Sequence, residues 1–352
     1  MIPAAALPQP RKVRQSPREL LERPLQILAV VGVFMALLFA VTPLAGGLGW
    51  ALCTYVGFIA VDWFENYRSH GKVVAKDRVA TMLVATAGLC TVVPLVLIVV
   101  YVVSKGFPGI TKAFFTETLE QAGPADPATV GGAKHAIIGT FQQVGLATLL
   151  ATPLGLLTAI HLTESRGRLA RVTRVLVDAM SGIPSIVAGL FIFTMFVIKF
   201  DQGFSGLSAA MALSVLMLPT VARTAEEVIK LVPDGLRESA LALGAPQWKM
   251  VMRIVLPAAR SGLVTATVLG VSRIAGETAP LLMTAFGSDS VNVNPFEGPQ
   301  SSLPLFAFQR VRAALPTQIA RGWAGALVLI VLVLSLFTLA RAVAARGRKA
   351  HS

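Results

Sequence analysis

The 352-residue sequence has few charged residues and only two cysteines. Charged side chains make up 14% of the chain and hydrophobic residues 55%, a balance that leaves too little charge for the surface of a soluble protein. Cys53 and Cys90 both lie inside apolar runs, which favours packing over a disulfide, a redox centre or a metal site. The formal charge of +13 comes from short basic clusters without interleaved aromatic residues, so nucleic-acid binding is not expected. The composition predicts an integral membrane protein.

Eight apolar runs approach the roughly 20 residues that a helix needs to cross a bilayer core of about 30 Å. They cover approximately residues 25–44, 47–63, 79–103, 136–161, 172–199, 206–221, 261–286 and 323–341. No run shows the strict alternation of a membrane β-strand. We therefore expect an all-α, polytopic protein that crosses a membrane several times and contacts membrane lipid.

Basic residues are unevenly divided between the segments that separate these runs. Of the 31 lysines and arginines, 23 fall on the side of the two chain ends, seven fall on the opposite side, and Arg273 stays inside a run. The positive-inside rule then predicts that both termini are cytoplasmic. Residues 11–44 also resemble a signal sequence, but the long basic region and the near-spanning apolar run favour an uncleaved first span.

The less apolar segment between residues 223 and 260 predicts two short cytoplasmic helices. We expect Asp234 to cap the first helix and Gly244 to end it in the left-handed conformation. The apolar residues expected to share one face of this helix are Leu236, Ala240 and Leu243. Pro246 is expected to open the second helix, which Leu256 and Pro257 would end. The expected buried side of the second helix consists of Trp248, Val251, Met252 and Val255.

This segment carries a spaced motif: Glu238-Ser239-Ala240, then Gly244, then residues 254–257 with the sequence IVLP. It resembles the EAA loop of ABC-importer permeases, with Ser239 in place of the usual alanine. The resemblance implies that residues 234–257 form a coupling helix that docks in a groove of a cytoplasmic ATPase subunit. The residues expected at that contact are Glu238, Ala240, Leu243, Gly244, Ile254 and Pro257. The alternative is an amphipathic helix pair that packs only on its own spans.

The apolar run 261–286 contains two ionisable residues, Arg273 and Glu277, four positions apart. On one continuous helix they would share a face and pair, which would lower the cost of about 2.5 to 3.5 kcal/mol for a charge at the centre of a span. Gly276 leaves room beside them, and Pro280 frees a backbone carbonyl, so this face could widen into a polar cavity. An arginine fork suits a tetrahedral oxyanion. A buried ion pair that only fixes helix register is the alternative.

Three blocks, residues 272–282 (SRIAGETAPLL), 181–191 (SGIPSIVAGLF) and 218–224 (LPTVART), resemble the PstA-type permease of the phosphate-uptake ABC importer. The resemblance runs from about residue 78 to the C-terminus. It implies a type I ABC importer permease core of six transmembrane helices, preceded here by a two-helix extension. It also implies a role in phosphate passage for Arg273 and Glu277.

The predicted substrate path includes further residues near these blocks. Its full set is Arg273, Glu277, Ser272, Gly276, Thr278, Arg223, Ser181 and Ser185. Arg223 lies at a span end, where its side chain could equally extend to the membrane interface. The break around Pro184 could expose backbone groups to a cavity, or could be a kink with close packing through Gly182 and Gly189.

The resemblance places the chain in a prokaryotic plasma or inner membrane, and together with the span count it predicts domains and partners. Residues 1–77 would form a cytoplasmic N-terminus and an accessory two-span hairpin, residues 78–346 the permease core with its transmembrane type-1 domain at about 136–342, and residues 347–352 a tail. The implied partners are a second related permease subunit, two cytoplasmic ATP-binding subunits and an external phosphate-binding protein. The sequence has no G-x-x-x-x-G-K-[ST] loop, so we expect no enzymatic activity and no cofactor in this chain, with ATP and Mg²⁺ bound by the ATPase.

Three other functions remain open at this point. An arginine and small polar groups do not choose phosphate over sulfate, molybdate or phosphonate. A gradient-driven secondary transporter could use the Arg273 and Glu277 pair as a proton relay. A membrane-embedded enzyme would need a nucleophile with a base, or a metal cluster, and the polar residues inside the apolar runs are too sparse for either.

Overall fold

The computed structural model describes residues 31–33, 36, 47–165 and 167–349. The regular structure of these residues is helical, with one isolated bridge between Phe286 and Gln300. Most of the predicted first span, 25–44, lies outside the described residues. The chain divides into two compact units, the first ending at Ile98 and the second beginning at Val99. The boundary that we predict at residue 78 stays a prediction.

The first unit is a helical hairpin of α2 (Gly47–His70) and the larger part of α3 (Lys72–Gly106). Gly71 makes the turn between them with a φ of +86°, a conformation that side chains with a Cβ rarely adopt. The hydroxyl groups of Tyr55 and Thr86 are hydrogen-bonded, and Arg78 pairs with Asp62 at 3.6 Å. The predicted span 47–63 therefore lies in a helix, but α2 is not among the helices that are long and apolar enough to cross a membrane.

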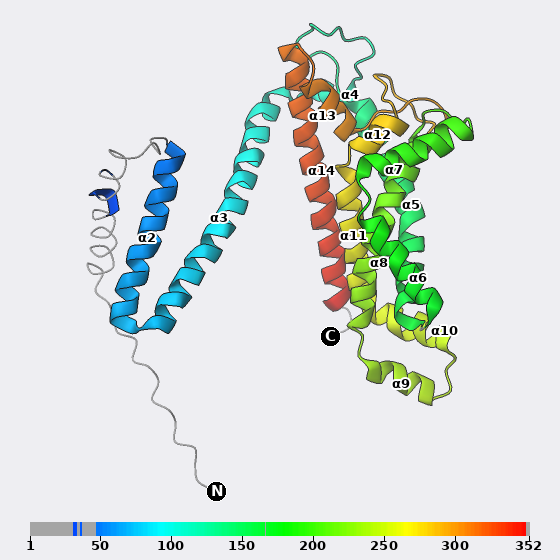
Figure 1. The fold of residues 1–352 in the computed structure, drawn as a ribbon. Coiled ribbons are helices and arrows are strands. Elements are labelled where there is room, and N and C mark those ends of the chain that lie inside the picture. The colour runs from blue at the N-terminus through cyan, green and yellow to red at the C-terminus, as the bar shows by residue number, and fades with distance from the viewer. Residues whose placement is uncertain (1–30, 34–35, 37–46, 166, 350–352) are drawn as a thin grey trace. The chain divides into compact units, whose positions relative to one another are not determined.

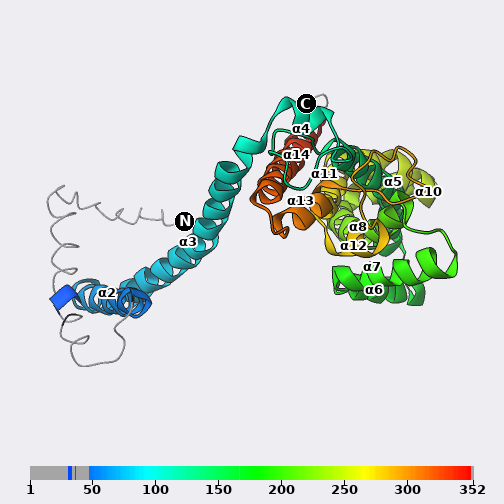
Figure 2. The ribbon, with the colours of Figure 1, turned by 90° about the horizontal axis from the view of Figure 1, so that it is seen from above.

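The second unit is a helical bundle built around α8 (Gly206–Lys230), which packs against α5, α6, α7, α11 and α12 (Figures 1 and 2). Its other elements, in chain order, are η1 (Phe107–Gly109), α4 (Lys112–Thr116), α5 (Lys134–Glu164), α6 (Arg168–Ser181), α7 (Ser185–Ile192), the π-helix η2 (Phe193–Lys199), α9 (Asp234–Ala242), α10 (Gln247–Met250), the π-helix η3 (Val251–Val255), α11 (Leu256–Ala275), α12 (Ala279–Thr284), α13 (Leu303–Val311) and α14 (Pro316–Lys349). Figure 1 shows α4, α12 and α13 at one end of this bundle and α9 and α10 at the other.

Five helical segments among the described residues are long and apolar enough to cross a membrane. They are Lys72–Gly109, Lys134–Glu164, Gly206–Lys230, Gln247–Ala275 and Pro316–Thr338. A sixth candidate is the pair Arg168–Ser181 and Ser185–Lys199, which is bent by 104°. The sequence predicts one apolar run there with a break around Pro184. The bend occurs because Pro184 has no N–H to donate and disfavours a helical conformation at the residue before it.

Glycines bring the central helices close together. A Cβ at Gly155 of α5 would lie 2.9 Å from the side chain of Val221 on α8, and one at Gly270 of α11 would lie 2.8 Å from the same valine. Small residues allow such approach between spans, where van der Waals packing rather than the hydrophobic effect holds helices together. Helix α8 is thereby enclosed, and Ala209, Ala210, Leu213 and Met217 are buried along it.

We predict that Gly155→Leu destabilises the bundle, while Gly145→Leu on the same helix does not. The leucine at 155 would overpack the contact with Val221, at a cost of about 1–3 kcal/mol. No atom lies within 4 Å of a Cβ at Gly145, and leucine favours the helix over glycine by nearly 1 kcal/mol. Thermal unfolding of the two purified variants in detergent measures the difference, and equal unfolding temperatures would contradict this packing.

Candidate functional site

Arg273 lies two residues before the last residue of α11 and reaches across to α8. Its Nη1 donates a hydrogen bond to the hydroxyl of Thr220 at 3.0 Å. The Arg273 side chain is exposed on the surface of the chain, whereas the neighbouring Ser272 has a buried hydroxyl with no hydrogen-bond partner among the described residues. Arg273 therefore presents a cation beside the hydroxyl groups of Ser272 and Thr220.

Glu277 does not continue the helix that holds Arg273, so the predicted i, i+4 pair is wrong. Helix α11 ends at Ala275, and Gly276 and Glu277 follow it, with the Glu277 amide donating to the carbonyl of Ile274 at 3.1 Å. Thr278 precedes α12, whose first turn contains Pro280. Among the described residues no ion pair joins Arg273 to Glu277. The physical reason is the glycine followed by a nearby proline, since both residues favour a helix break over a continuous turn.

Glu226 of α8 is the centre of a cluster of charges. Its side chain is 0% exposed, and its two oxygens face three cations. Arg174 of α6 lies 3.0 Å from Oε1, Lys230 lies 2.9 Å from the same oxygen, and Arg223 lies 2.9 Å from Oε2. Arg223 also pairs with Asp178 of α6. This cluster connects α6 to the end of α8 by charge-assisted hydrogen bonds.

Sequence reasoning included Arg223 in the predicted path but missed Glu226, Arg174 and Lys230. The spacing of Arg223, Glu226 and Lys230 along one helix is a detectable signal, because i, i+3 and i, i+4 positions share a face. The contribution of Arg174 comes from packing between α6 and α8 and has no local signature. The structure thus pairs Arg223 with Asp178 and Glu226 inside the cluster. The alternative, a side chain that extends alone to the membrane interface, does not describe this arrangement.

The predicted break after α6 is confirmed, and it lies beside the second break. Between Ser181 and Ser185 the chain turns through Gly182, and the Ser181 hydroxyl donates to the carbonyl of Val177 at 2.9 Å. Further along, a Cβ at Gly189 of α7 would lie 2.6 Å from the Cα of Pro280 in α12. The two sequence blocks that contain Gly189 and Pro280 are therefore packed backbone against backbone. Among the described residues, no hydrogen bond joins Ser181 or Ser185 to Arg273.

The predicted cytoplasmic helices form, with differences at both ends. Helix α9 begins at Asp234 with no side-chain cap, and Asp234 instead pairs with Arg237 at 3.2 Å. Gly244 has a φ of +80°, which confirms the left-handed residue after the helix. Leu256 and Pro257 do not end the second helix, because Pro257 occupies the first turn of α11, where a missing N–H costs no hydrogen bond.

The buried and exposed faces of this region also differ from the prediction. Ala240 is buried, together with Met250, Val251 and Val255, against Ala159 of α5 and Ile229 of α8. Two side chains that the sequence predicted on the buried side of the second helix, Trp248 and Met252, are exposed instead. Leu236 and Leu243 of α9, which were expected to share a face with Ala240, are exposed as well. Leu243 is 90% exposed and Trp248 62%. The helical periodicity was correct, but the apolar residues divide between a face that packs on the chain and a face that is open.

Two polar side chains, Arg237 and Gln247, tie the open region to the bundle. Arg237 donates to the carbonyl of Ile229 at 2.8 Å and lies 3.5 Å from the carboxylate of Glu164, while Gln247 donates to the Glu164 carbonyl at 3.2 Å. A mostly apolar cavity of about 430 Å³ lies alongside, between the end of α5 and the helices α10 and η3, where Trp248 and Met252 line it. Glu238 and Gly244 are exposed and Ile254 is half-buried.

The part of the chain that the structure describes contains no group of three or more His, Cys, Asp or Glu side chains placed to hold a metal ion.

Comparison with known proteins adds independent findings. A model of the family described as "Binding-protein-dependent transport system inner membrane component" matches residues 151–349. The chain is 40% identical over 279 residues to "Phosphate transport system permease protein PstA 1" of Mycobacterium tuberculosis (strain ATCC 25618 / H37Rv), which covers 78% of this chain and 90% of the relative. It is 38% identical over 275 residues to "Phosphate transport system permease protein PstA" of Haemophilus influenzae, covering 77% of this chain and 93% of the relative.

These matches include the bundle, the charge cluster around Glu226 and the open helical region after α8. The family model covers more than half of the chain, and both relatives are matched over most of their own length. This chain belongs to the family of binding-protein-dependent transport system inner membrane components.

Proposed function

We propose that this chain is the membrane subunit of an ATP-driven importer of inorganic phosphate and forms half of its translocation path. The observation that best supports this is a cation, Arg273, held between two apolar helices by a hydroxyl instead of a carboxylate. Such a cation is costly at membrane depth unless it serves a path. Relatives that are 38–41% identical are phosphate permeases by name, which favours phosphate over other oxyanions.

The path that we propose passes from Arg273 to Arg223 along α8. Thr220, which accepts from Arg273, and Arg223 are three residues apart and therefore neighbours on the helix surface. Among the residues that the structure describes, Arg273 has no carboxylate partner, so a phosphate can bind it without displacing one. Arg223 is held by Asp178 and Glu226, and these carboxylates would compete with a bound phosphate and so promote its release. Glu277 follows the end of α11 and, in this scheme, repels the anion and does not neutralise Arg273.

The open face of the α9 to η3 region is the proposed contact with a cytoplasmic ATPase subunit. Exposed Leu243, Trp248 and Met252 offer apolar anchors of the kind that insert into a groove, and exposed Glu238 can pair with a basic residue at its rim. Ala240 faces the chain itself and would act by holding α9 in place. On this basis the α9 end and both termini are cytoplasmic, and ATP with Mg²⁺ binds to the ATPase.

The remaining parts of the proposed machine are a second related permease, two ATPase subunits and an external phosphate-binding protein. Arg273 is exposed in the single chain, which is consistent with a path completed by a second permease. A gradient-driven transporter that relays protons through an Arg273 and Glu277 pair loses its structural basis, since the described residues do not form that pair. Competition by sulfate or molybdate in an uptake assay distinguishes phosphate from the other oxyanions.

We predict that Arg273→Gln lowers phosphate uptake at least tenfold in the assembled transporter. Removing a charge-assisted hydrogen bond to the anion costs about 1.5–3 kcal/mol. Glu277→Gln is expected to have a smaller effect, because its carboxylate does not bond to Arg273. Uptake of radiolabelled phosphate at matched membrane expression measures both, with Lys199→Gln, a cation at the end of η2, as the control. Near-normal uptake by Arg273→Gln would overturn the proposed path.

We expect Glu226→Gln to lower the unfolding temperature of the protein by several degrees. A neutral amide leaves Arg174, Arg223 and Lys230 without their shared carboxylate. The cost is about 1–3 kcal/mol, less than for a sealed ion pair, because the Arg174 and Lys230 side chains are each 43% exposed. The matched control is Glu227→Gln, whose carboxylate is 70% exposed and pairs with Lys230 alone. Similar unfolding temperatures for both variants would show that the cluster contributes little.

A third prediction concerns the proposed ATPase contact. Leu243→Asp places a charge on a side chain that is 90% exposed, so it leaves the fold intact but disrupts an apolar contact with a partner. We expect at least a tenfold loss of co-purified ATPase subunit in mild detergent. Val293→Asp, on an exposed side chain at the other end of the bundle, serves as the control and keeps the ATPase bound. Equal recovery with both variants would locate the contact elsewhere.

A further inference from the structure

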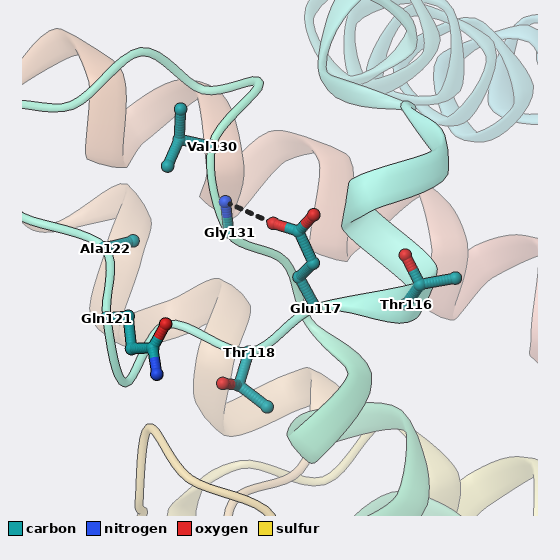
Figure 3. A pocket seen from close by; sticks show the side chains of 7 residues that line it. All are labelled: Thr116, Glu117, Thr118, Gln121, Ala122, Val130 and Gly131. Atoms are coloured by element: carbon teal, nitrogen blue, oxygen red, sulfur yellow. Dashed lines mark hydrogen bonds between the residues drawn. The ribbon is translucent and has the colours of Figure 1, made fainter.

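A pocket of about 390 Å³ lies in the segment between α4 and α5, at the end of the bundle opposite α9 (Figures 1 and 3). Its lining residues are Thr116, Glu117, Thr118, Gln121, Ala122, Val130 and Gly131. Residues 113–133 contain Glu117, Glu120 and Asp126 but no lysine or arginine. The pocket is therefore polar, with one carboxylate in its wall and no cation, and it would repel a phosphate ion.

Only one of the two carboxylate oxygens of Glu117 accepts a hydrogen bond from the described residues. One carboxylate oxygen, Oε2, accepts a hydrogen bond from the Gly131 amide at 3.1 Å, the contact drawn in Figure 3. The other oxygen has no hydrogen-bond partner among the described residues, and the side chain is exposed. No ion pair described in this chain includes Glu117. Its charge is thus held at the pocket wall and remains available to a partner.

The far wall of the pocket is fixed from behind by Arg321 of α14. This side chain is buried, and its Nη2 donates to the carbonyls of Asp126, Pro127 and Val130 at 3.3, 3.1 and 2.8 Å. Gln318, one helical turn earlier, donates to the carbonyl of Pro124 at 3.0 Å. The segment that forms this wall is consequently tied to a membrane helix along its length.

The near wall is fixed by close backbone packing. The Gly132 amide donates to the carbonyl of Thr118 at 3.2 Å, and a Cβ at Gly132 would lie 2.2 Å from the carbonyl oxygen of Ala113. Gly131 has a φ of +74°, which directs its amide to Glu117. With both walls held, the pocket is formed before any partner arrives, and binding there costs little ordering entropy.

We propose that this pocket receives a basic side chain, lysine or arginine, from the external substrate-binding protein. The inference rests on the proposed function, which places this end of the bundle outside the cell. The occupant is a cation because the wall offers a free carboxylate oxygen and three more acceptor side chains, Thr116, Thr118 and Gln121. It is a side chain of a protein because a single carboxylate does not suffice for a metal ion. Glu120 and Asp126 add two carboxylates to the same segment, which Lys112 and Lys134 flank.

The test uses the complete transporter in nanodiscs and the phosphate-loaded binding protein of the same organism. ATP hydrolysis is measured while the concentration of the binding protein is varied. Glu117→Gln keeps an oxygen for the Gly131 amide but removes the charge, and we expect it to raise the half-maximal concentration three- to tenfold. Glu117→Lys is expected to raise it more than tenfold. Both variants should reach the wild-type maximal rate and should depend less on salt than the wild type does.

The control is Glu297→Gln, an exposed acid on another segment at the same end, which should leave the half-maximal concentration unchanged. A wild-type half-maximal concentration for Glu117→Lys would overturn the inference while leaving the proposed function intact. A lower maximal rate at an unchanged half-maximal concentration would overturn it as well, since Glu117 would then act after docking. A wild-type complex that does not respond to the loaded binding protein would contradict the proposed function and this inference together.

Discussion

A charge inside an apolar bundle must be balanced where it lies, and this requirement shapes the structure around α8. Glu226 is completely shielded from solvent, and three cations from two helices surround its two oxygens. A single partner would leave one oxygen without a charge-assisted contact, and no partner would cost several kcal/mol. The position of α6 on α8 therefore follows from electrostatics as much as from packing.

Helix α8 also connects the two places where function is proposed. At its middle, Thr220 accepts from Arg273 of α11, and one turn later Arg223 begins the charge cluster. At its end, the carbonyl of Ile229 accepts from Arg237, which belongs to α9. A displacement of α9 by an ATPase would thus act on the same helix that holds the cations of the path. The connection is short because it uses neighbouring turns of one helix.

Much of the fold follows from the sequence, because apolar runs of spanning length leave few alternatives to membrane helices. The bend at Pro184 and the left-handed Gly244 were likewise readable, since each depends on local backbone chemistry. The predicted pairing of Arg273 with Glu277 was wrong because the helix breaks at Gly276, so the four-residue spacing no longer puts the two side chains on one face. The cluster around Glu226 could not be predicted in full, because the contact with Arg174 arises from how α6 packs on α8. Periodicity located the helices after α8. It could not tell the apolar side chains that pack on this chain from those that stay exposed for a partner.

The two ends of the bundle are held together by different contacts, as expected if one end is a rigid docking surface and the other end moves. At the end with α4 and α13, side chains of α14 hold backbone carbonyls of an irregular segment, which makes a fixed surface. At the α9 end, Arg237 and Gln247 tie the helices to the bundle beside the buried contact of Ala240 and Val255, and large apolar side chains stay exposed. The breaks after α6 and α11 fall between these ends, with Gly189 directly against Pro280. Because a helix bends most easily where its hydrogen bonds are already interrupted, motion that starts at the α9 end would be absorbed at these breaks, beside Arg273, before it reached the fixed surface.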